Sequence, residues 1–212
     1  MRLPLGWSRA RATLAIAALL AAAFVLVYAA GLDARAPSWA GFLPYRFSFD
    51  GYAQGAPLAL TPLTATLVHG NWIHLGFSLL ILLLCGRAVE GVVGPVGIVI
   101  LYVLGAYAAA AGHFLLEPRG LVPMYGASGA VAAVIGAYAM LFGKRKPGIG
   151  NARLGFWLNA LWLIAFWIVL QLLLAYVSAR PSVGIAIGAH VGGFLLGMAL
   201  ARPLLLLRYR KA

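Results

Sequence analysis

One serine lies in a setting that suits a nucleophile, at the head of an apolar run. The motif Gly126-Ala127-Ser128-Gly129 comes directly before the apolar residues 130–142. A Gly-x-Ser-Gly turn that leads into a helix exposes the serine hydroxyl and leaves free backbone N–H groups beside it. Such a turn can hold a nucleophile and stabilise an oxyanion. Glycine and serine are also common in membrane helices for packing reasons, so the rest of the chain must decide between the two interpretations.

A serine hydroxyl needs a base to take its proton, and histidine is the usual one. The chain has four histidines, which are His69, His74, His113 and His190. Its four carboxylates are Asp33, Asp50, Glu90 and Glu117. None of them is expected on a helix at the depth of His190, so the pattern predicts a Ser–His dyad rather than a triad. We expect no metal site and no cofactor, because there is no HExxH motif and no carboxylate near the histidines.

The composition places this chemistry in a membrane. Of the 212 residues, 64% are hydrophobic and only 9% are charged. A soluble domain of this length could not bury so much apolar surface. We therefore expect an all-α polytopic membrane protein. The single cysteine, Cys85, excludes an internal disulfide.

Charged and helix-breaking residues divide the apolar sequence into six expected spans. These are residues 13–31, 72–85, 92–116, 126–142, 156–177 and 183–207. A secretory signal peptide is the alternative for the first run, but a signal core normally has only ~7–15 residues. The long first outer loop, 32–61, mixes aromatic residues with Pro and Gly. It is either a plain connector or a structured element at the membrane–water interface.

The positive charges predict the orientation of these spans. The net charge is +12, but Lys and Arg occupy the gaps between apolar runs, not a basic stripe that would bind nucleic acid. With the N-terminus inside, the outer residues are Arg35, Arg46, Arg119 and Arg180, which leaves twelve of the sixteen Lys and Arg residues inside. The positive-inside rule then predicts a cytoplasmic segment at 1–12, one membrane domain at 13–207 and a cytoplasmic tail at 208–212.

The same topology brings Ser128 and His190 to a similar depth. His190 lies about eight residues into its span, roughly 10–12 Å below the outer surface. The span that Ser128 opens covers only ~25 Å of the ~30 Å hydrocarbon core, so its head must be recessed. Small residues at four-residue spacing permit close contact of the two helices. They are Gly129, Ala133 and Ala137 on one helix, and Ala189, Gly193, Gly197 and Ala201 on the other. A hydrogen bond between Ser128 and His190 is therefore expected, which favours catalysis over packing.

These motifs resemble those of the rhomboid family of intramembrane serine proteases over roughly residues 63–198. His69-Gly-Asn-Trp-Ile-His74 is similar to the family's paired histidines. Gly86-Arg-Ala-Val-Glu90 followed by Gly94 resembles its turn after the second helix. Gly126-Ala-Ser128-Gly129 resembles the nucleophile motif, and Ala189-His190-Val-Gly-Gly193-Phe-Leu-Leu-Gly197 resembles the general-base helix.

The resemblance implies a six-transmembrane-helix bundle with a long first outer loop and a water-filled cavity open to the outside. It implies Ser128 as nucleophile and His190 as general base. The oxyanion would be stabilised by His74, Ser78 and the backbone N–H groups of Ser128 and Gly129. A buried core histidine is the alternative for His74. The residues with expected structural roles are His69, Glu90, Gly126, Gly193 and Gly197, and Glu90 would tie down the inner end of the second span.

Two positions depart from the family pattern. Ser78 stands where the family usually has an asparagine, which shortens one oxyanion donor, although a hydroxyl can still donate. Ala132 stands where the family often has a tyrosine that stacks on the base histidine. Another aromatic residue, such as Tyr138 or Phe194, is a candidate to compensate.

Together these features predict a bacterial inner-membrane serine endopeptidase that cleaves transmembrane proteins in or near their membrane segments. Its expected partners are these substrates and the lipid bilayer, with no nucleic acid, and its active site would open to the outer side. One alternative is a catalytically inactive rhomboid-like protein that binds transmembrane partners, which the two departures favour. A small transporter is a weaker alternative, because the sequence shows neither coupling charges nor an inverted repeat.

Overall fold

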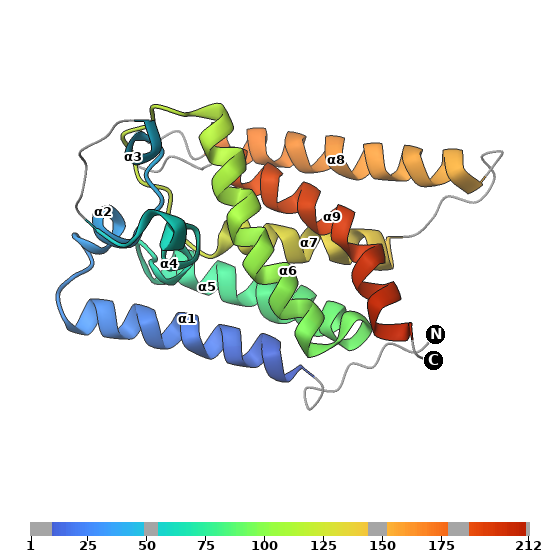
Figure 1. Ribbon diagram of the computed structural model, residues 1–212, viewed down its shortest axis with the longest axis horizontal. Coiled ribbons are helices and arrows are strands. Elements are labelled where there is room, and N and C mark those ends of the chain that lie inside the picture. The colour runs from blue at the N-terminus through green and yellow to red at the C-terminus, as the bar shows by residue number, and fades with distance from the viewer. Residues whose placement is uncertain (1–9, 49–54, 144–151, 178–186, 211–212) are drawn as a thin grey trace.

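The computed structural model describes residues 10–48, 55–143, 152–177 and 187–210, and these form helices joined by short connections (Figure 1). The longer helices are α1 (Arg11–Ala29), α5 (Trp72–Ile81), α6 (Arg87–Leu116), α7 (Ser128–Phe142), α8 (Ala152–Val177) and α9 (Ile187–Tyr209). The shorter ones are α2 (Ala36–Ala40), α3 (Tyr45–Ser48) and α4 (Thr61–Leu67). The predicted segments at 1–9, 144–151, 178–186 and 211–212 lie outside the described residues.

Three helices in the described part are long and apolar enough to cross a membrane. They are α1, the continuous stretch Trp72–Leu116 and α9. Shorter apolar helices include Ser128–Phe142 and Trp157–Val169. The chain is thus a helical membrane protein by the length and composition of its helices.

The end of the second span differs from the sequence prediction. A π-helical turn, Leu82–Gly86, joins α5 directly to α6, so the helix does not end at Cys85. The axis breaks instead at Gly94, where φ is +82°, and Pro95 follows. Glycine adopts this backbone conformation without a Cβ clash, and proline has no N–H to continue the hydrogen-bond ladder. Arg87 and Glu90, which the sequence suggested as the end of the span, are therefore helical.

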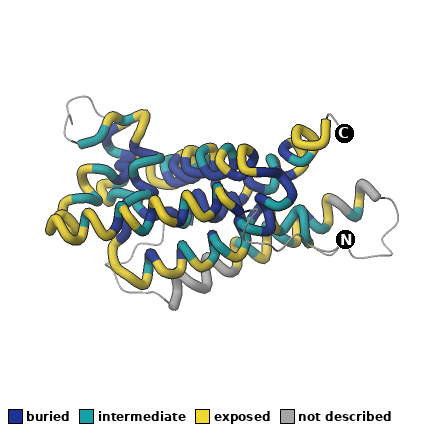
Figure 2. Tube along the Cα trace, turned by 90° about the horizontal axis from the view of Figure 1, so that it is seen from below, coloured by how far each residue is buried: buried dark blue, intermediate teal, exposed yellow. Residues whose placement is uncertain are grey.

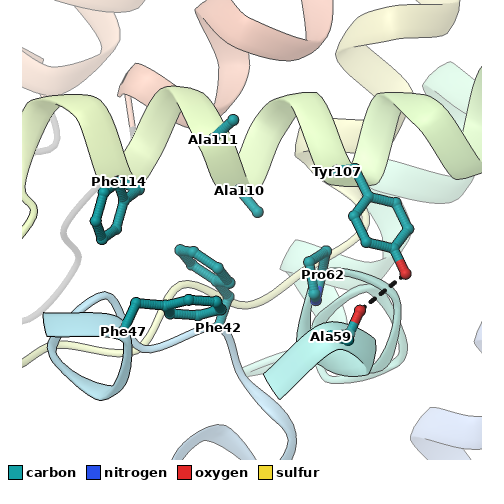
Figure 3. Close-up of a pocket in the computed structure, with 8 residues that line it drawn as sticks. All are labelled: Phe42, Phe47, Ala59, Pro62, Tyr107, Ala110, Ala111 and Phe114. Carbon is teal, nitrogen blue, oxygen red and sulfur yellow. Dashed lines mark hydrogen bonds between the residues drawn. The ribbon is translucent and has the colours of Figure 1, made fainter. Parts of the chain in front are cut away.

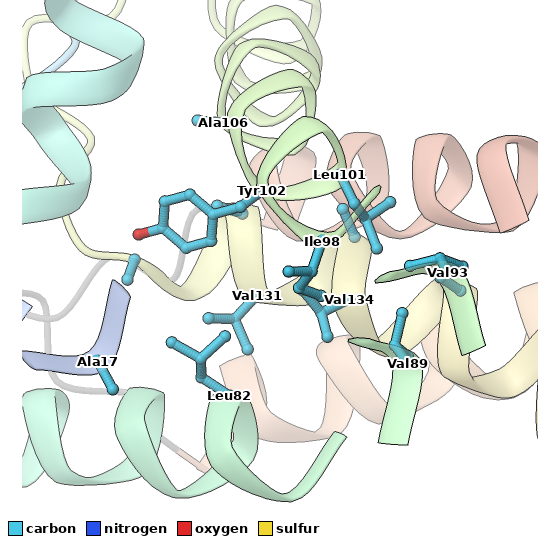
Figure 4. Packing of buried hydrophobic residues seen from close by; sticks show 14 of the residues in the cluster. Ala17, Leu82, Val89, Val93, Ile98, Leu101, Tyr102, Ala106, Val131 and Val134 are labelled. Atoms are coloured by element: carbon cyan, nitrogen blue, oxygen red, sulfur yellow. The ribbon is translucent and has the colours of Figure 1, made fainter. Parts of the chain in front are cut away.

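The hydrophobic core surrounds α7, which packs most closely against α6 and α9. Side chains from α1, the π-helical turn, α6 and α7 meet there, as Ala17, Leu82, Ile98 and Val134 illustrate (Figure 4). Buried residues are concentrated in the middle of the molecule, and exposed ones cover the outer helices (Figure 2). Many exposed side chains are large and apolar, as expected of surfaces that contact lipid.

The first loop is partly structured in the described residues. It contains α2, α3 and a 3₁₀ turn at Leu58–Leu60, and α4 follows. Phe42 and Met124 exchange two backbone hydrogen bonds, of 2.9 and 2.8 Å, which fasten this loop to the segment before α7. The structured alternative therefore describes this loop better than a plain connector, whereas its place at the membrane interface stays a prediction.

Glu90 joins three helices at one end of the molecule. Its buried carboxylate accepts hydrogen bonds from the N–H groups of Ala12 (3.0 Å) and Thr13 (2.7 Å) and from the Thr13 hydroxyl (2.6 Å). Arg208 of α9 donates to the Glu90 carbonyl oxygen at 3.1 Å. Ala10 gives α1 no side-chain cap, so Glu90 supplies the acceptors and the negative charge that a helix N-terminus favours.

Candidate active site

Ser128 is the first residue of α7, and the preceding turn determines where its backbone points. Gly126 has φ of +111°, a conformation that L side chains rarely adopt. Its N–H donates to the Ala65 carbonyl oxygen at 2.9 Å, and the N–H of Ala127 donates to Nε2 of His69 at 3.3 Å. The turn is thereby fixed to α4 and to the loop before α5. Ser128 itself is half-buried.

Nε2 of His190, in α9, lies 2.8 Å from Oγ of Ser128. The hydrogen bond that the sequence led us to expect between these two residues is present. In the tautomer with the proton on Nδ1, the serine hydroxyl donates to Nε2, which is the arrangement a general base requires. Nδ1 of His190 is buried and has no hydrogen-bond partner among the described residues. The pair therefore stands without a carboxylate in this part of the chain.

Close contact between α7 and α9 makes this hydrogen bond geometrically possible. A Cβ atom added to Gly193 would collide with the carbonyl oxygen of Gly129, and one added to Gly197 would collide with that of Ala133. Gly129 in turn lies against Ala109 of α6, whose Cβ would be 2.5 Å from an added Cβ. The small residues at four-residue spacing thus let the two backbones touch, as the sequence predicted.

His74 lies on the other side of the serine turn. Asn71 caps α5 by accepting a hydrogen bond from the His74 N–H at 2.8 Å. The imidazole of His74 packs against Gly126, where an added Cβ would be 2.7 Å from Nε2 and 2.6 Å from Cε1. This places a ring that can donate a hydrogen bond next to the backbone that leads to Ser128.

His69 contacts both His74 and the turn before Ser128. Its ring centroid is 5.1 Å from that of His74 in an edge-to-face arrangement, and its Nε2 accepts from Ala127 as described above. Burial lowers the pKa of His69 to about 4, with nearby His74 as the second cause. His69 is therefore neutral near pH 7 and can serve as an acceptor. His113 is buried elsewhere, with its ring 6.4 Å from that of Phe42.

The two residues that depart from the family pattern, Ser78 and Ala132, are both buried next to the candidate site. Ser78 is buried one turn after His74 on the same face of α5. Ala132 is buried against α9, where an added Cβ on Gly193 would be 3.4 Å from the Ala132 Cβ. Tyr138, one candidate to compensate, is partly exposed and pairs with Phe142 at 4.9 Å.

The other candidate, Phe194, belongs to a contact that sequence reasoning missed. Its ring stacks on Trp167 of α8, with centroids 4.8 Å apart and planes 8° apart. The indole N–H of Trp167 also donates to the carbonyl oxygen of His190 at 3.3 Å. No sequence pattern distinguishes Trp167 from the other tryptophans of α8, because apolar residues surround each of them.

An apolar groove lies away from these residues, between the first loop and α6 (Figure 3). Aromatic rings from Phe42, Phe47, Tyr107 and Phe114 line it, and the Tyr107 hydroxyl donates to the Ala59 carbonyl oxygen at 2.8 Å. It includes none of the candidate catalytic side chains. Among its lining side chains, only that of Tyr107 carries a polar group.

Comparison with known proteins shows which family the chain belongs to. The Rhomboid domain family model matches residues 59–207. A curated relative, the Rhomboid protease GlpG of Enterobacter sp. (strain 638), is 34% identical over 141 residues, or 65% of this chain and 46% of that protein. The matched region thus spans less than half the length of that relative. Because the family model covers well over half of the chain, this protein belongs to the rhomboid family.

Proposed function

We propose that this protein is an intramembrane serine endopeptidase with Ser128 as nucleophile and His190 as general base. The observation that carries the proposal is the 2.8 Å contact between Ser128 Oγ and His190 Nε2 in a rhomboid family member. A pair at this distance can transfer a proton directly. The expected substrates are membrane proteins, cleaved in or near a transmembrane segment.

In the first step, Ser128 Oγ attacks the carbonyl carbon of the scissile peptide bond while His190 Nε2 takes the serine proton. The carbonyl oxygen becomes an oxyanion. Free N–H groups at the start of α7, including those of Ser128 and Gly129, and the positive end of the helix dipole favour negative charge there. His74, which packs against Gly126, is a second donor. Ser78 contributes from the next turn of α5.

In the second step, the tetrahedral intermediate collapses and the C–N bond breaks. Protonated His190 gives its proton to the leaving amine, which leaves an acyl group on Ser128. Water then attacks the acyl-enzyme and His190 takes its proton. The C–Oγ bond breaks, His190 returns that proton to Ser128 Oγ, and the acid product departs. Both steps use the two side chains as a unit, and neither step uses a metal or an organic cofactor.

The proposal includes six spans, cytoplasmic termini and a site open to the outer side of a bacterial inner membrane. The orientation rests on the charge distribution, and the depth of the site rests on the short α7, whose 15 residues cover less than the thickness of the hydrocarbon core, so that Ser128 at its head lies below the outer surface. Water must reach Ser128 from the outside. A helical substrate must unwind locally, because its carbonyl groups are otherwise hydrogen-bonded within the helix.

The test is cleavage of a co-expressed membrane protein with one transmembrane segment and a tag at each end. We expect the wild type to release a shorter tagged fragment, and Ser128→Ala and His190→Ala to leave the reporter intact. If all three proteins leave every tested reporter intact, that result would favour a non-catalytic rhomboid-like binding protein. The departures at Ser78 and Ala132 would then explain the loss of activity. Cleavage that survives in Ser128→Ala would contradict the proposed nucleophile.

A further inference from the structure

Helix α8 makes few contacts with the rest of the described chain, and one of its side chains reaches the base-bearing helix. Large side chains along α8, such as Leu161, Phe166 and Val169, are more than half exposed, at 63%, 54% and 63%. Trp167 is half-buried instead and contacts α9. It lies on the same face of α8 as the buried Ala160 and the half-buried Leu163 and Ile164, and its indole N–H adds a polar contact to this packing.

Trp167 holds one turn of α9 through two different interactions. Its indole N–H donates to the carbonyl oxygen of His190, and its ring stacks on Phe194, four residues later. Residues four apart lie on the same face of a helix, so both contacts act on one side of a single turn. A carbonyl oxygen has two lone pairs and can accept this bond in addition to its helical one.

The opposite side of the same turn is fixed by α7. Gly193 packs on the Gly129 carbonyl oxygen, and Ala132 fills the place beside it. This close packing leaves α7 without an aromatic ring at position 132 to hold the imidazole. Nδ1 of His190 also has no hydrogen-bond partner among the described residues. The direction of the His190 side chain therefore depends on how the backbone of this turn is held.

We propose that Trp167 is a positioning residue for His190. By clamping the turn from His190 to Phe194 against α8, it keeps His190 Nε2 within hydrogen-bond distance of Ser128 Oγ. This inference rests on the proposed function of His190 as general base. The contacts of Trp167 are to the His190 carbonyl oxygen and to the Phe194 ring, so its expected effect is on the rate of serine activation and not on binding.

The experiment measures the inactivation of detergent-purified, full-length protein by an alkyl fluorophosphonate, which reacts with an activated serine. Its maximal rate, kinact, reports activation of Ser128, and KI reports binding of the probe. Trp167→Leu removes both contacts, whereas Trp167→Phe keeps a ring for stacking and removes only the N–H donor. Phe166→Leu is the matched control, since it removes an aromatic ring from the exposed neighbouring position.

We expect Trp167→Leu to lower kinact by about 10- to 100-fold, because small misplacement of a catalytic group has effects of this size. KI should stay within about twofold. Trp167→Phe should react faster than Trp167→Leu and remain about fivefold below the wild type, as for the loss of one neutral hydrogen bond. Phe166→Leu should match the wild type.

The inference is overturned if Trp167→Leu keeps the wild-type kinact, or if its loss is equalled by Phe166→Leu. If Trp167→Leu does not fold, as judged by helix content and thermal melting, Trp167→Phe decides, and an unchanged kinact in that variant overturns the inference. A wild type that does not react at Ser128 would overturn the proposed function itself, which separates the two failures.

Discussion

At the scale of single residues, the site depends on a few polar groups that approach one turn of backbone from different elements. His190 reaches Ser128 from α9, His74 packs on Gly126 from α5, and His69 accepts from Ala127. Each of these contacts meets the segment 126–128. Substitutions of single side chains therefore test single roles, and the changes at Ser78 and His69 described below test two of them.

Ser78 tests the oxyanion donors. We expect Ser78→Asn to leave reporter cleavage intact or raise it, because an amide reaches further than a hydroxyl and donates from two N–H bonds. Ser78→Ala should lower cleavage by up to about 10²–10³-fold, the loss typical of one oxyanion donor. Equal rates for Ser78→Ala and the wild type would show that Ser78 is only a packing residue.

His69 predicts how stability depends on pH. Its pKa is about 4 in the folded protein, below the ordinary value of 6.5, so protonation opposes folding. The stabilisation that neutral His69 provides is present above pH 6.5 and is lost as pH falls from 6.5 towards 4. Thermal melting should show this fall in the wild type and a smaller fall in His69→Gln, which keeps an acceptor and does not titrate. Equal slopes for the two proteins would contradict the assignment.

At the scale of elements, backbone contact between α7 and α9 determines whether the dyad can form. Gly197 matters because an added Cβ would collide with the Ala133 carbonyl oxygen, whereas nothing lies within 4 Å of a Cβ added to Gly76 of α5. Both positions are helical, so alanine gives both the same gain in helix propensity. The comparison therefore isolates the contact between the two helices.

We expect Gly197→Ala to destabilise the protein by about 1–3 kcal/mol, as overpacking does, and to lower reporter cleavage by separating α9 from α7. Gly76→Ala should change stability by no more than about 1 kcal/mol and leave cleavage unchanged. Thermal melting and the two-tag reporter measure these effects. If the two variants behave alike, close contact of α7 and α9 is not what positions His190.

The elements also show what the sequence could predict. Small residues at four-residue spacing and the depths of Ser128 and His190 were sufficient to predict their hydrogen bond. The sequence placed the far end of the second span at the charged residues Arg87 and Glu90, but the helix continues through both of them to the kink at Gly94. Glu90 is instead buried, since its carboxylate caps α1 from a position 77 residues away from Thr13. Such a partner, like Trp167 for His190, is defined only by the three-dimensional fold.

At the scale of the whole molecule, a single orientation in the membrane must place most positive charges on the inner side and the Ser128 turn on the outer side. Glu90 and Arg208 place the start of α1, the middle of the α5–α6 unit and the end of α9 at one end of the protein. The described residues of the two terminal segments that the positive-inside rule assigns to the cytoplasm, 10–12 and 208–210, adjoin this end. The Ser128 turn is joined to the first loop through α4 and would face the opposite side.

Reporter fusions test this orientation directly. Fusions at the C-terminus and after Arg145, which lies outside the described residues, should report a cytoplasmic location. A fusion near Glu117 should report the outside. The physical reason is the excess of Lys and Arg on the inner side. An external C-terminus would contradict the six-span topology and place Ser128 at the wrong face.

The central claim is that Ser128 and His190 act as one catalytic unit. The most direct measurement is covalent labelling by an alkyl fluorophosphonate, with the modified residue identified by mass spectrometry. We expect label on Ser128 alone in the wild type, and none in Ser128→Ala, in His190→Ala or in the double variant, because losses within one catalytic unit do not add. All four proteins should keep the same helix content. Strong labelling of Ser128 in folded His190→Ala, or label at another residue in Ser128→Ala, would contradict the dyad.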